Sequence, residues 1–207
     1  MLAERLARQL AGDTAWDRGL VLGLPRGGVP VAGQVASRLD VPLDVLLVRK
    51  IGLPEQPELA MGAVAAIGDR TAVVRNEPVL RQRRLPSTEF AAACRAELDT
   101  LHRHAVRYRG DREPLALAAR PVIVVDDGLA TGATMRAAVA TLREAGVGRL
   151  ALGVPIGSPR TCEALARLVD VLVCPWQPPD FSSVSQGYRD FGQVSEATVI
   201  QILAASG

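Results

Sequence analysis

Residues 122–134 read Val-Ile-Val-Val-Asp-Asp-Gly-Leu-Ala-Thr-Gly-Ala-Thr, and this segment decides the fold. Its first four residues are aliphatic and β-branched, which is typical of a buried strand in a parallel sheet. Two acids and a glycine-containing turn follow, and residues 134–145 have the apolar spacing of a helix that stops at Gly146. The turn should therefore lie at the carboxyl edge of a sheet, where free helix N–H groups favour an anion.

Asp126 and Asp127 cannot contact such an anion favourably, so they need another part of the same ligand. Vicinal hydroxyls or a metal-linked oxygen would suit two carboxylates. A phosphate on one side and a diol on the other describe a ribose 5-phosphate. The alternative is an ordinary capped strand-turn-helix, which explains one acid but not two adjacent ones.

The same segment resembles the phosphoribosyl-diphosphate (PRPP) signature of the type I phosphoribosyltransferases. The resemblance implies that Asp126 and Asp127 hold the ribose hydroxyls and, indirectly through PRPP or water, the Mg²⁺ cofactor. Ala130 stands where hypoxanthine and guanine members have an aspartate, which argues against a 6-oxopurine acceptor. The residues implied to bind the 5-phosphate are Gly128, Leu129, Ala130, Thr131, Gly132, Ala133 and Thr134.

A second strand-turn-helix pattern lies near the start of the chain. The apolar run 20–24 leads into Pro25-Arg26-Gly27-Gly28, and residues 29–39 have helical spacing. The glycines admit a close approach of a ligand, and Arg26 offers a planar donor fork to phosphate oxygens. The turn resembles the family's pyrophosphate loop, in which many members have a cis peptide; a plain turn with an exposed arginine is the alternative. The resemblance makes Arg26 catalytic and places Gly27 and Gly28 at the substrate.

Residues 43–48 predict a third strand, followed by Arg49 and Lys50. Lys50 is the only lysine among 24 basic residues, so a compact ammonium is expected to serve a purpose there. At the end of a strand it could meet the leaving diphosphate as a mobile point charge, with Arg49 beside it at the substrate. A lysine that survives by chance on the surface is the alternative.

Strands and helices alternate along most of the chain, which predicts a single α/β domain over residues 1–207 with a parallel sheet. Ligands of such sheets bind at the carboxyl ends of the strands. An amphipathic helix is expected at residues 1–11, in place of a signal peptide. The other expected elements are strands 121–125, 149–154 and 170–174, helix 160–168, and a hairpin of residues 59–67 and 71–75 around Gly68 and Asp69.

Residues 76–120 interrupt the alternation and are interpreted as a helical insert or a mobile cover over the site. A helix of about six turns is expected, with arginines on its solvated faces. His102 and His104 are two residues apart on that helix and make a poor metal-binding pair. The apolar stripe consists of Phe90, Cys94, Leu98, Leu101, Ala105 and Tyr108.

Residues 175–207 are the candidate hood, the variable segment that in this family covers the core and selects the nucleophile. Four of the seven aromatic residues of the chain lie here. They are interpreted either as rings that stack on the acceptor or as core plugs. The four are Trp176, Phe181, Tyr188 and Phe191.

Composition agrees with one globular enzyme. The hydrophobic content of 48% excludes a disordered chain, and a formal charge of +2 is too small to imply nucleic-acid or membrane binding. Cys94, Cys162 and Cys174 are expected to be small core residues in a reducing compartment, and the location is expected to be cytoplasmic.

The function expected from the resemblance is Mg²⁺-dependent transfer of ribose 5-phosphate from PRPP to a nitrogenous acceptor, with release of diphosphate. The alternative is a PRPP- or nucleotide-binding regulator on the same fold. A dinucleotide-dependent oxidoreductase would need G-x-G-x-x-G after the first strand, which residues 23–28 do not provide. The acceptor and the oligomeric state, a homodimer included, stay open.

Overall fold

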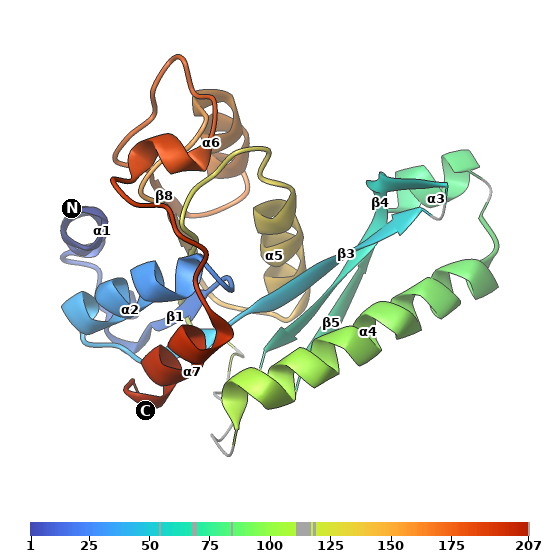
Figure 1. Cartoon of the computed structure of the whole chain (residues 1–207), viewed down its shortest axis with the longest axis horizontal. Coiled ribbons are helices and arrows are strands. Elements are labelled where there is room, and N and C mark those ends of the chain that lie inside the picture. Colours follow the sequence, from blue (N-terminus) through green and yellow to red (C-terminus); the bar gives the residue numbers. More distant parts are fainter. Residues whose placement is uncertain (54, 68–69, 84, 111–116, 118, 207) are drawn as a thin grey trace.

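Two sheets organise the molecule in the computed structural model, which describes residues 1–53, 55–67, 70–83, 85–110, 117 and 119–206. A five-stranded parallel sheet forms the core. A three-stranded antiparallel sheet projects from the core as an arm, with one long helix lying along it (Figure 1).

The core sheet consists of five short, mostly buried strands in the order β2-β1-β6-β7-β8, all parallel. Chain order runs outward in opposite directions from β1 and β6, so a topological switch point lies between these two strands. Leu20 pairs with Val122 and Gly23 with Val125, so their carboxyl ends lie side by side. Open sheets of this kind bind ligands at such a crevice. The bounds are β1 (Leu20–Gly23), β2 (Leu43–Val45), β6 (Val122–Val125), β7 (Leu150–Gly153) and β8 (Val171–Val173).

Helices cover both faces of the core sheet. Successive strand residues point to opposite faces, so Val21 and Ile123 share one hydrophobic cluster with α1 and α2, whereas Leu22 and Val124 share another with α5 and α6. This two-sided burial explains why the strands read as continuous apolar runs. The predicted alternation is confirmed by α1 (Leu2–Leu10), α2 (Gly28–Leu39), α5 (Ala133–Glu144) and α6 (Pro159–Ala166).

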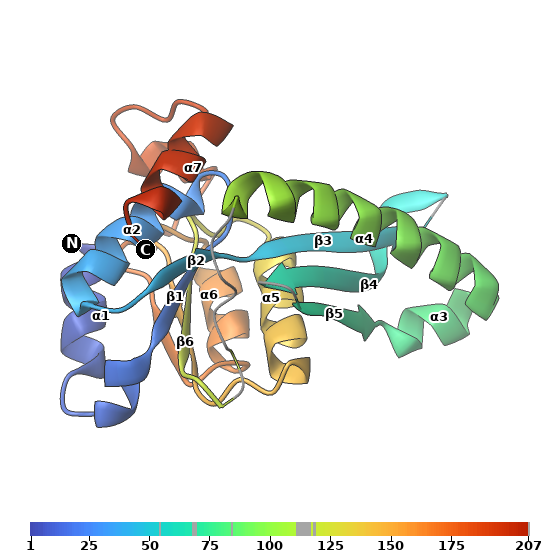
Figure 2. The same cartoon turned by 90° about the horizontal axis from the view of Figure 1, so that it is seen from below.

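The arm is an antiparallel sheet in the order β3-β4-β5, with α5 packed on one face and α4 on the other (Figure 2). A Cβ at Gly62 would lie 2.9 Å from the Phe90 ring, so glycine lets α4 approach the sheet closely. Burial of Phe90, Leu101 and Tyr108 confirms the predicted apolar stripe. The bounds are β3 (Leu47–Leu53), β4 (Gln56–Ile67), β5 (Arg70–Arg75), α3 (Glu77–Arg83) and α4 (Ser87–Arg109).

One predicted strand was wrong. Residues 43–48 do not form a single element: β2 ends at Val45, and the N–H of Leu46 donates to the Gly23 carbonyl at 3.0 Å. The chain then leaves the core sheet, and the interruption begins at Leu47 instead of residue 76. Arg49 and Lys50 consequently lie inside β3, opposite Val64 and Ala63, and not at the end of a strand.

The predicted hairpin is confirmed by the pairing of β4 with β5, while its turn residues Gly68 and Asp69 lie outside the described residues. The three cysteines are free thiols, of which Cys94 and Cys162 are buried. In the part of the chain that is described, no helix is both long and apolar enough to cross a bilayer.

The final segment contains a helix that was not predicted. After β8 the chain is irregular except for a 3-10 turn, Val184–Gly187, and α7, Glu196–Ala204, then packs against α2 and α4. Its signal was present in the sequence: Ser195 caps the helix by accepting from the Thr198 N–H at 3.1 Å. A second short 3-10 turn, Thr14–Arg18, was also missed.

Candidate active site

Two loops meet at the switch point, and glycines make their contact possible. The glycine loop, residues 25–28, follows β1, and the acid pair, Asp126 and Asp127, follows β6. A Cβ at Gly27 would lie 1.9 Å from Asp127 Oδ2, and one at Gly28 would lie 2.7 Å from the Val125 carbonyl oxygen. A side chain at Gly28 would push the two backbones apart, and one at Gly27 would displace the Asp127 carboxyl. The peptide bond between Pro25 and Arg26 is cis.

The acid pair is desolvated and self-repelling. The N–H of Asp127 donates to Asp126 Oδ1 at 2.9 Å. Burial, and then the charge of Asp127, raises the pKa of Asp126 to about 8, and burial also raises the pKa of Asp127. At neutral pH the pair therefore retains a proton.

The acid pair has the hard oxygen donors that Mg²⁺ prefers. Among the described residues, no cluster of three or more His, Cys, Asp or Glu side chains could hold a metal ion by itself. Two carboxylates whose pKa values are raised fit a cation that is shared with a bound ligand or with water.

Hydrogen bonds with residues 156–161 hold the turn formed by residues 128–134 in place. Leu129 is 2% exposed; its N–H donates to the Ile156 carbonyl at 2.9 Å, and its carbonyl accepts from the Ser158 N–H at 2.8 Å. The Ala130 carbonyl accepts from Thr161 Oγ1 at 2.7 Å. Leu129 thus anchors the turn, because its side chain and both of its backbone groups are already engaged.

The turn ends at the N-terminus of α5, which is exposed to solvent. Gly132 precedes α5 with φ 71°, a left-handed conformation that suits glycine, and no side chain caps the helix at this residue. Thr131, Ala133 and Thr134 are exposed. The guanidinium of Arg136 donates to the Thr131 carbonyl, which fixes the turn from the side. The Ala133 N–H donates to Thr131 Oγ1 at 3.5 Å. The first turn of α5 lies at the positive end of the helix dipole, which favours an anion.

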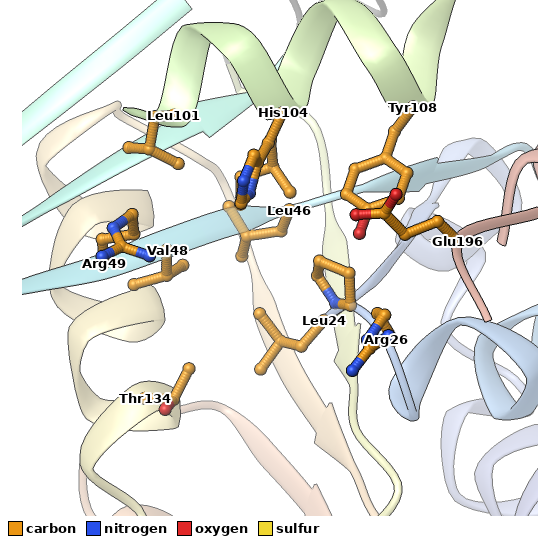
Figure 3. A pocket seen from close by; sticks show the side chains of 12 residues that line it. Leu24, Arg26, Leu46, Val48, Arg49, Leu101, His104, Tyr108, Thr134 and Glu196 are labelled. Carbon is orange, nitrogen blue, oxygen red and sulfur yellow. The ribbon is translucent and has the colours of Figure 1, made fainter. Parts of the chain in front are cut away.

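Two cavities lie on either side of Arg26. The α4 cavity, of about 450 Å³, is shown in Figure 3, with side chains from α4 above the loop that follows β1. It contains two guanidinium groups, those of Arg26 and Arg49, which suit an anionic group. Its lining is Leu24, Pro25, Arg26, Leu46, Leu47, Val48, Arg49, Leu101, His104, Tyr108, Thr134 and Glu196.

The hood cavity, of about 400 Å³, lies between the glycine loop and residues 188–194. The hydroxyl of Tyr188 donates to the Asp127 carbonyl at 2.5 Å, and the rings of Tyr188 and Phe191 lie 5.1 Å apart. Burial, and then the charge of Asp127, raises the pKa of Tyr188, so the phenol stays a donor. The lining is Arg26, Gly27, Pro30, Val31, Asp127, Tyr188, Asp190, Phe191, Gly192, Gln193 and Val194.

The aromatic residues of the final segment are not core plugs. Phe191 is 45% exposed and Trp176 is 43% exposed. A Cβ at Gly128 would lie 2.4 Å from Val184 Cγ1, so glycine lets the 3-10 turn of this segment rest on the 128–134 turn. The segment therefore covers the side of the acid pair that faces the hood cavity.

The structure brings most of the predicted site residues together, but it separates Arg49 from Lys50. Arg26, the two glycines, the acid pair and the 128–134 turn all lie at the switch point. Arg49 lines the α4 cavity, whereas Lys50 is not among the described residues that line either cavity. Neighbouring strand side chains point to opposite faces, so Lys50 does not share the α4 cavity with Arg49, and its role at the substrate stays a prediction.

Sequence reasoning missed three residues of the α4 cavity: His104, Tyr108 and Glu196. From the sequence, His104 is considered only as a metal ligand, and Tyr108 only as part of the apolar stripe. Their spacing carried a signal, because His104 is three residues after Leu101 and four before Tyr108, on one side of the helix.

Comparison with known proteins gives consistent matches. The model of a family described as the phosphoribosyl transferase domain matches residues 1–182. Curated relatives from two strains of Mycobacterium tuberculosis, whose names mark them provisionally as phosphoribosyl transferases, are 46% identical over 202 residues. That match covers 98% of this chain and 44% of the relatives, so the chain spans less than half of their length.

A solved structure extends the match to three dimensions. The crystal structure of TT1426 from Thermus thermophilus is 38% identical, with a TM-score of 0.83. The match covers 99% of this chain and 95% of that one. Both the core and the arm therefore have a counterpart in a solved protein.

Proposed function

The chain belongs to the phosphoribosyl transferase family, and from this premise we propose that it transfers the ribose 5-phosphate of PRPP to a nitrogenous acceptor, releasing diphosphate. One observation carries the proposal: the contact of the glycine loop with the acid pair at the switch point, beside the open end of α5. Two segments that are far apart in the sequence, residues 25–28 and residues 126–134, thereby face one ligand that carries two anionic ends and a diol.

In this proposal each part of PRPP has its own partner. The 5-phosphate lies on the turn with Thr131 and Thr134, and the ribose hydroxyls donate to Asp126 and Asp127. Leu129 contributes as the buried anchor of the turn. The diphosphate extends past Arg26 into the α4 cavity, which supplies cationic side chains. The acceptor enters from the hood cavity, on the other side of Arg26.

The reaction forms a bond from an acceptor nitrogen to C1 and breaks the bond from C1 to a diphosphate oxygen. Negative charge grows on that oxygen, so a cation fixed beside it lowers the barrier. Arg26 takes this role in the proposal, together with Arg49 in place of Lys50, because Arg49 is the basic residue of β3 that lines the α4 cavity. Arg49 also forms an ion pair with Glu97, which holds its guanidinium in place.

The acid pair would hold Mg²⁺ through PRPP oxygens or water, and the bound ion would supply additional charge stabilisation at the diphosphate. The raised pKa of Asp126 fits this role, because a cation and two hydroxyl donors would favour the ionised pair. In this chain the residues themselves orient the ribose, since the glycine contact at Gly27 keeps the Asp127 carboxyl in one place.

The hood cavity supports a flat, nitrogen-containing ring as the acceptor. Tyr188 and Phe191 offer two adjacent aromatic surfaces, and Tyr188 is tied to the backbone of Asp127. A covering segment also keeps water from replacing the acceptor as the nucleophile. Ala130, exposed on the turn, offers no carboxylate to a purine, which argues against 6-oxopurines.

A thermal-melt experiment tests the proposal. PRPP with Mg²⁺ at about one hundred times its Kd should stabilise the folded protein by about 2.7 kcal/mol. For a domain of this size that corresponds to a rise in melting temperature of roughly 5–10 °C. Asp127→Asn should reduce the rise, and an unchanged melting temperature of the wild-type protein at saturating PRPP would refute the proposal.

Turnover is tested with a panel of nitrogenous bases, by following diphosphate release. An enzyme should release diphosphate with at least one flat heteroaromatic base. Tight PRPP binding without release across a broad panel would instead favour a PRPP-binding regulator.

A further inference from the structure

Helix α4 closes the α4 cavity from above. Leu101, His104 and Tyr108 occur at steps of three and four, so one side of the helix directs all three toward the cavity (Figure 3). Leu101 is 1% and Tyr108 5% exposed, and both are anchored in the hydrophobic core. His104 is exposed, so its ring reaches the open space of the cavity.

Helix α4 thus forms the roof of the cavity, and an ion pair holds it on each side of the cavity. On the β3 side, Arg49 Nε forms an ion pair with Glu97 Oε2. On the α7 side, Arg107 Nη2 lies 2.7 Å from Glu196 Oε2. Together with the buried stripe below, these contacts attach α4 to two neighbouring elements. The roof is therefore part of the folded architecture.

The charges around the cavity suit an anion despite the carboxylate of Glu196. Arg107 offsets that carboxylate and Glu97 offsets Arg49, so Arg26 gives the lining its net positive charge. Burial, and then the charge of Glu196, raises the pKa of Tyr108, so its phenol stays neutral. An anionic group in this cavity would thus meet cations and neutral donors.

His104 is oriented for such a group. Its ring lies edge-on to Tyr108, with centroids 6.3 Å apart and an interplanar angle of 76°. Since Tyr108 is buried, this contact restricts the position of the imidazole. Within the described chain, no protein group forms a hydrogen bond with the His104 ring, so a ring N–H is available to a ligand oxygen.

We propose that His104 is a leaving-group residue, which donates a hydrogen bond to the diphosphate of PRPP from the fixed roof formed by α4. This inference rests on the proposed function and adds a residue to it. The bond should strengthen as charge grows on the diphosphate, so His104 acts on the rate as well as on binding. It does not reach ribose 5-phosphate, which has no diphosphate.

Calorimetry with three probes tests the proposal: PRPP with Mg²⁺, inorganic diphosphate with Mg²⁺, and ribose 5-phosphate. His104→Ala should weaken binding of PRPP and diphosphate by about tenfold or more, the loss of a hydrogen bond to a charged group. Ribose 5-phosphate should bind as it does to the wild-type protein. His104→Gln keeps an N–H donor and should recover part of the affinity.

His102→Ala is the matched control, because His102 is an exposed histidine of the same helix that does not line the cavity. It should leave the binding of all three probes unchanged. Equal weakening of PRPP and ribose 5-phosphate by His104→Ala would show a purely structural role and overturn the proposal. Unchanged PRPP affinity in both His104 variants would overturn it as well.

The same titrations distinguish a failure of the proposed function from a failure of the role of His104. A wild-type protein that binds none of the three probes would refute the proposed function itself. A wild-type protein that binds PRPP, with His104 variants that bind it equally well, would refute only the role of His104.

Discussion

Gly27→Ala should displace the Asp127 carboxyl without unfolding the protein. An alanine Cβ at this position would lie 1.9 Å from Asp127 Oδ2 and 2.6 Å from Asp127 Cγ. Asp127 Cβ, at 3.2 Å, is close but tolerable. Rotation of the Asp127 carboxyl relieves the clash, so the side chain yields and the backbone stays in place.

The expected magnitudes follow from this geometry. The carboxyl oxygen must move by more than an ångström to reach an ordinary contact distance, which would break the bond to a ribose hydroxyl that we propose for it. Losing a hydrogen bond that involves a charged group costs about 1.5–3 kcal/mol, or roughly tenfold to more than a hundredfold in PRPP affinity. Overpacking should lower the free energy of unfolding by about 1–3 kcal/mol.

Two further glycines provide comparisons. At Gly28 the clashing atoms are backbone, with the Val125 carbonyl at 2.7 Å and Asp126 Cα at 2.8 Å, so Gly28→Ala should destabilise the fold more than Gly27→Ala does. Gly33→Ala, in the same helix, meets two apolar side-chain atoms, Ile202 Cγ2 at 3.2 Å and Leu43 Cδ2 at 3.9 Å, and should leave PRPP binding unchanged.

Calorimetric titration with PRPP and Mg²⁺, paired with urea unfolding, separates these effects. Wild-type PRPP affinity in a folded Gly27→Ala protein would refute the reasoning, because the position of the Asp127 carboxyl would then be irrelevant to the ligand. An equal loss of affinity in Gly33→Ala would instead point to a general effect on α2.

The acid pair and the hood cavity yield two further predictions. Unfolded Asp126 ionises near its ordinary pKa of 3.8, whereas folded Asp126 stays protonated until about pH 8; the free energy of unfolding of the ligand-free protein should therefore fall as pH rises between these values. Urea unfolding should show a smaller fall for Asp126→Asn, and an equal fall would contradict the shifted pKa. Tyr188→Phe removes the donor to the Asp127 carbonyl and should cost about 0.5–1.5 kcal/mol of stability, measured by urea unfolding. Full retention of stability would mean that this bond does not hold the cavity wall.

Local signals in the sequence were enough to predict most of the core. The apolar run that ends in Asp126 and Asp127 was correctly read as a strand, and the helix after it begins at Ala133. Strand and helix periodicities depend on neighbours within a few residues, so they can be recognised in the sequence before the fold is known. Glycines in both turns likewise indicated close contacts, although not which atoms they approach.

Pairing between distant segments was not predictable in the same way. Residues 43–48 are apolar throughout except for Asp44, and nothing local indicates that the chain changes sheets at Leu46. Side chains alternate between the two faces of β3, and the register of this strand places Arg49 in the α4 cavity but not Lys50. A shift by one residue would move every side chain of the strand to the opposite face. Lys50 was expected at the end of a strand only if residues 43–48 form one strand, and they do not.

What the sequence by itself determined was most of the short strands and helices of the core, the acid pair and the glycine-containing turn that follows it. Only the tertiary structure decided which side chains share a cavity. Three residues that are distant in the sequence meet in the α4 cavity: His104 on α4, Glu196 on α7 and Arg26 after β1. They meet because α7 packs against both α4 and α2, and α2 follows the loop that carries Arg26. Burial of an apolar stripe positions a helix, and the polar residue beside that stripe is carried to the cavity with it.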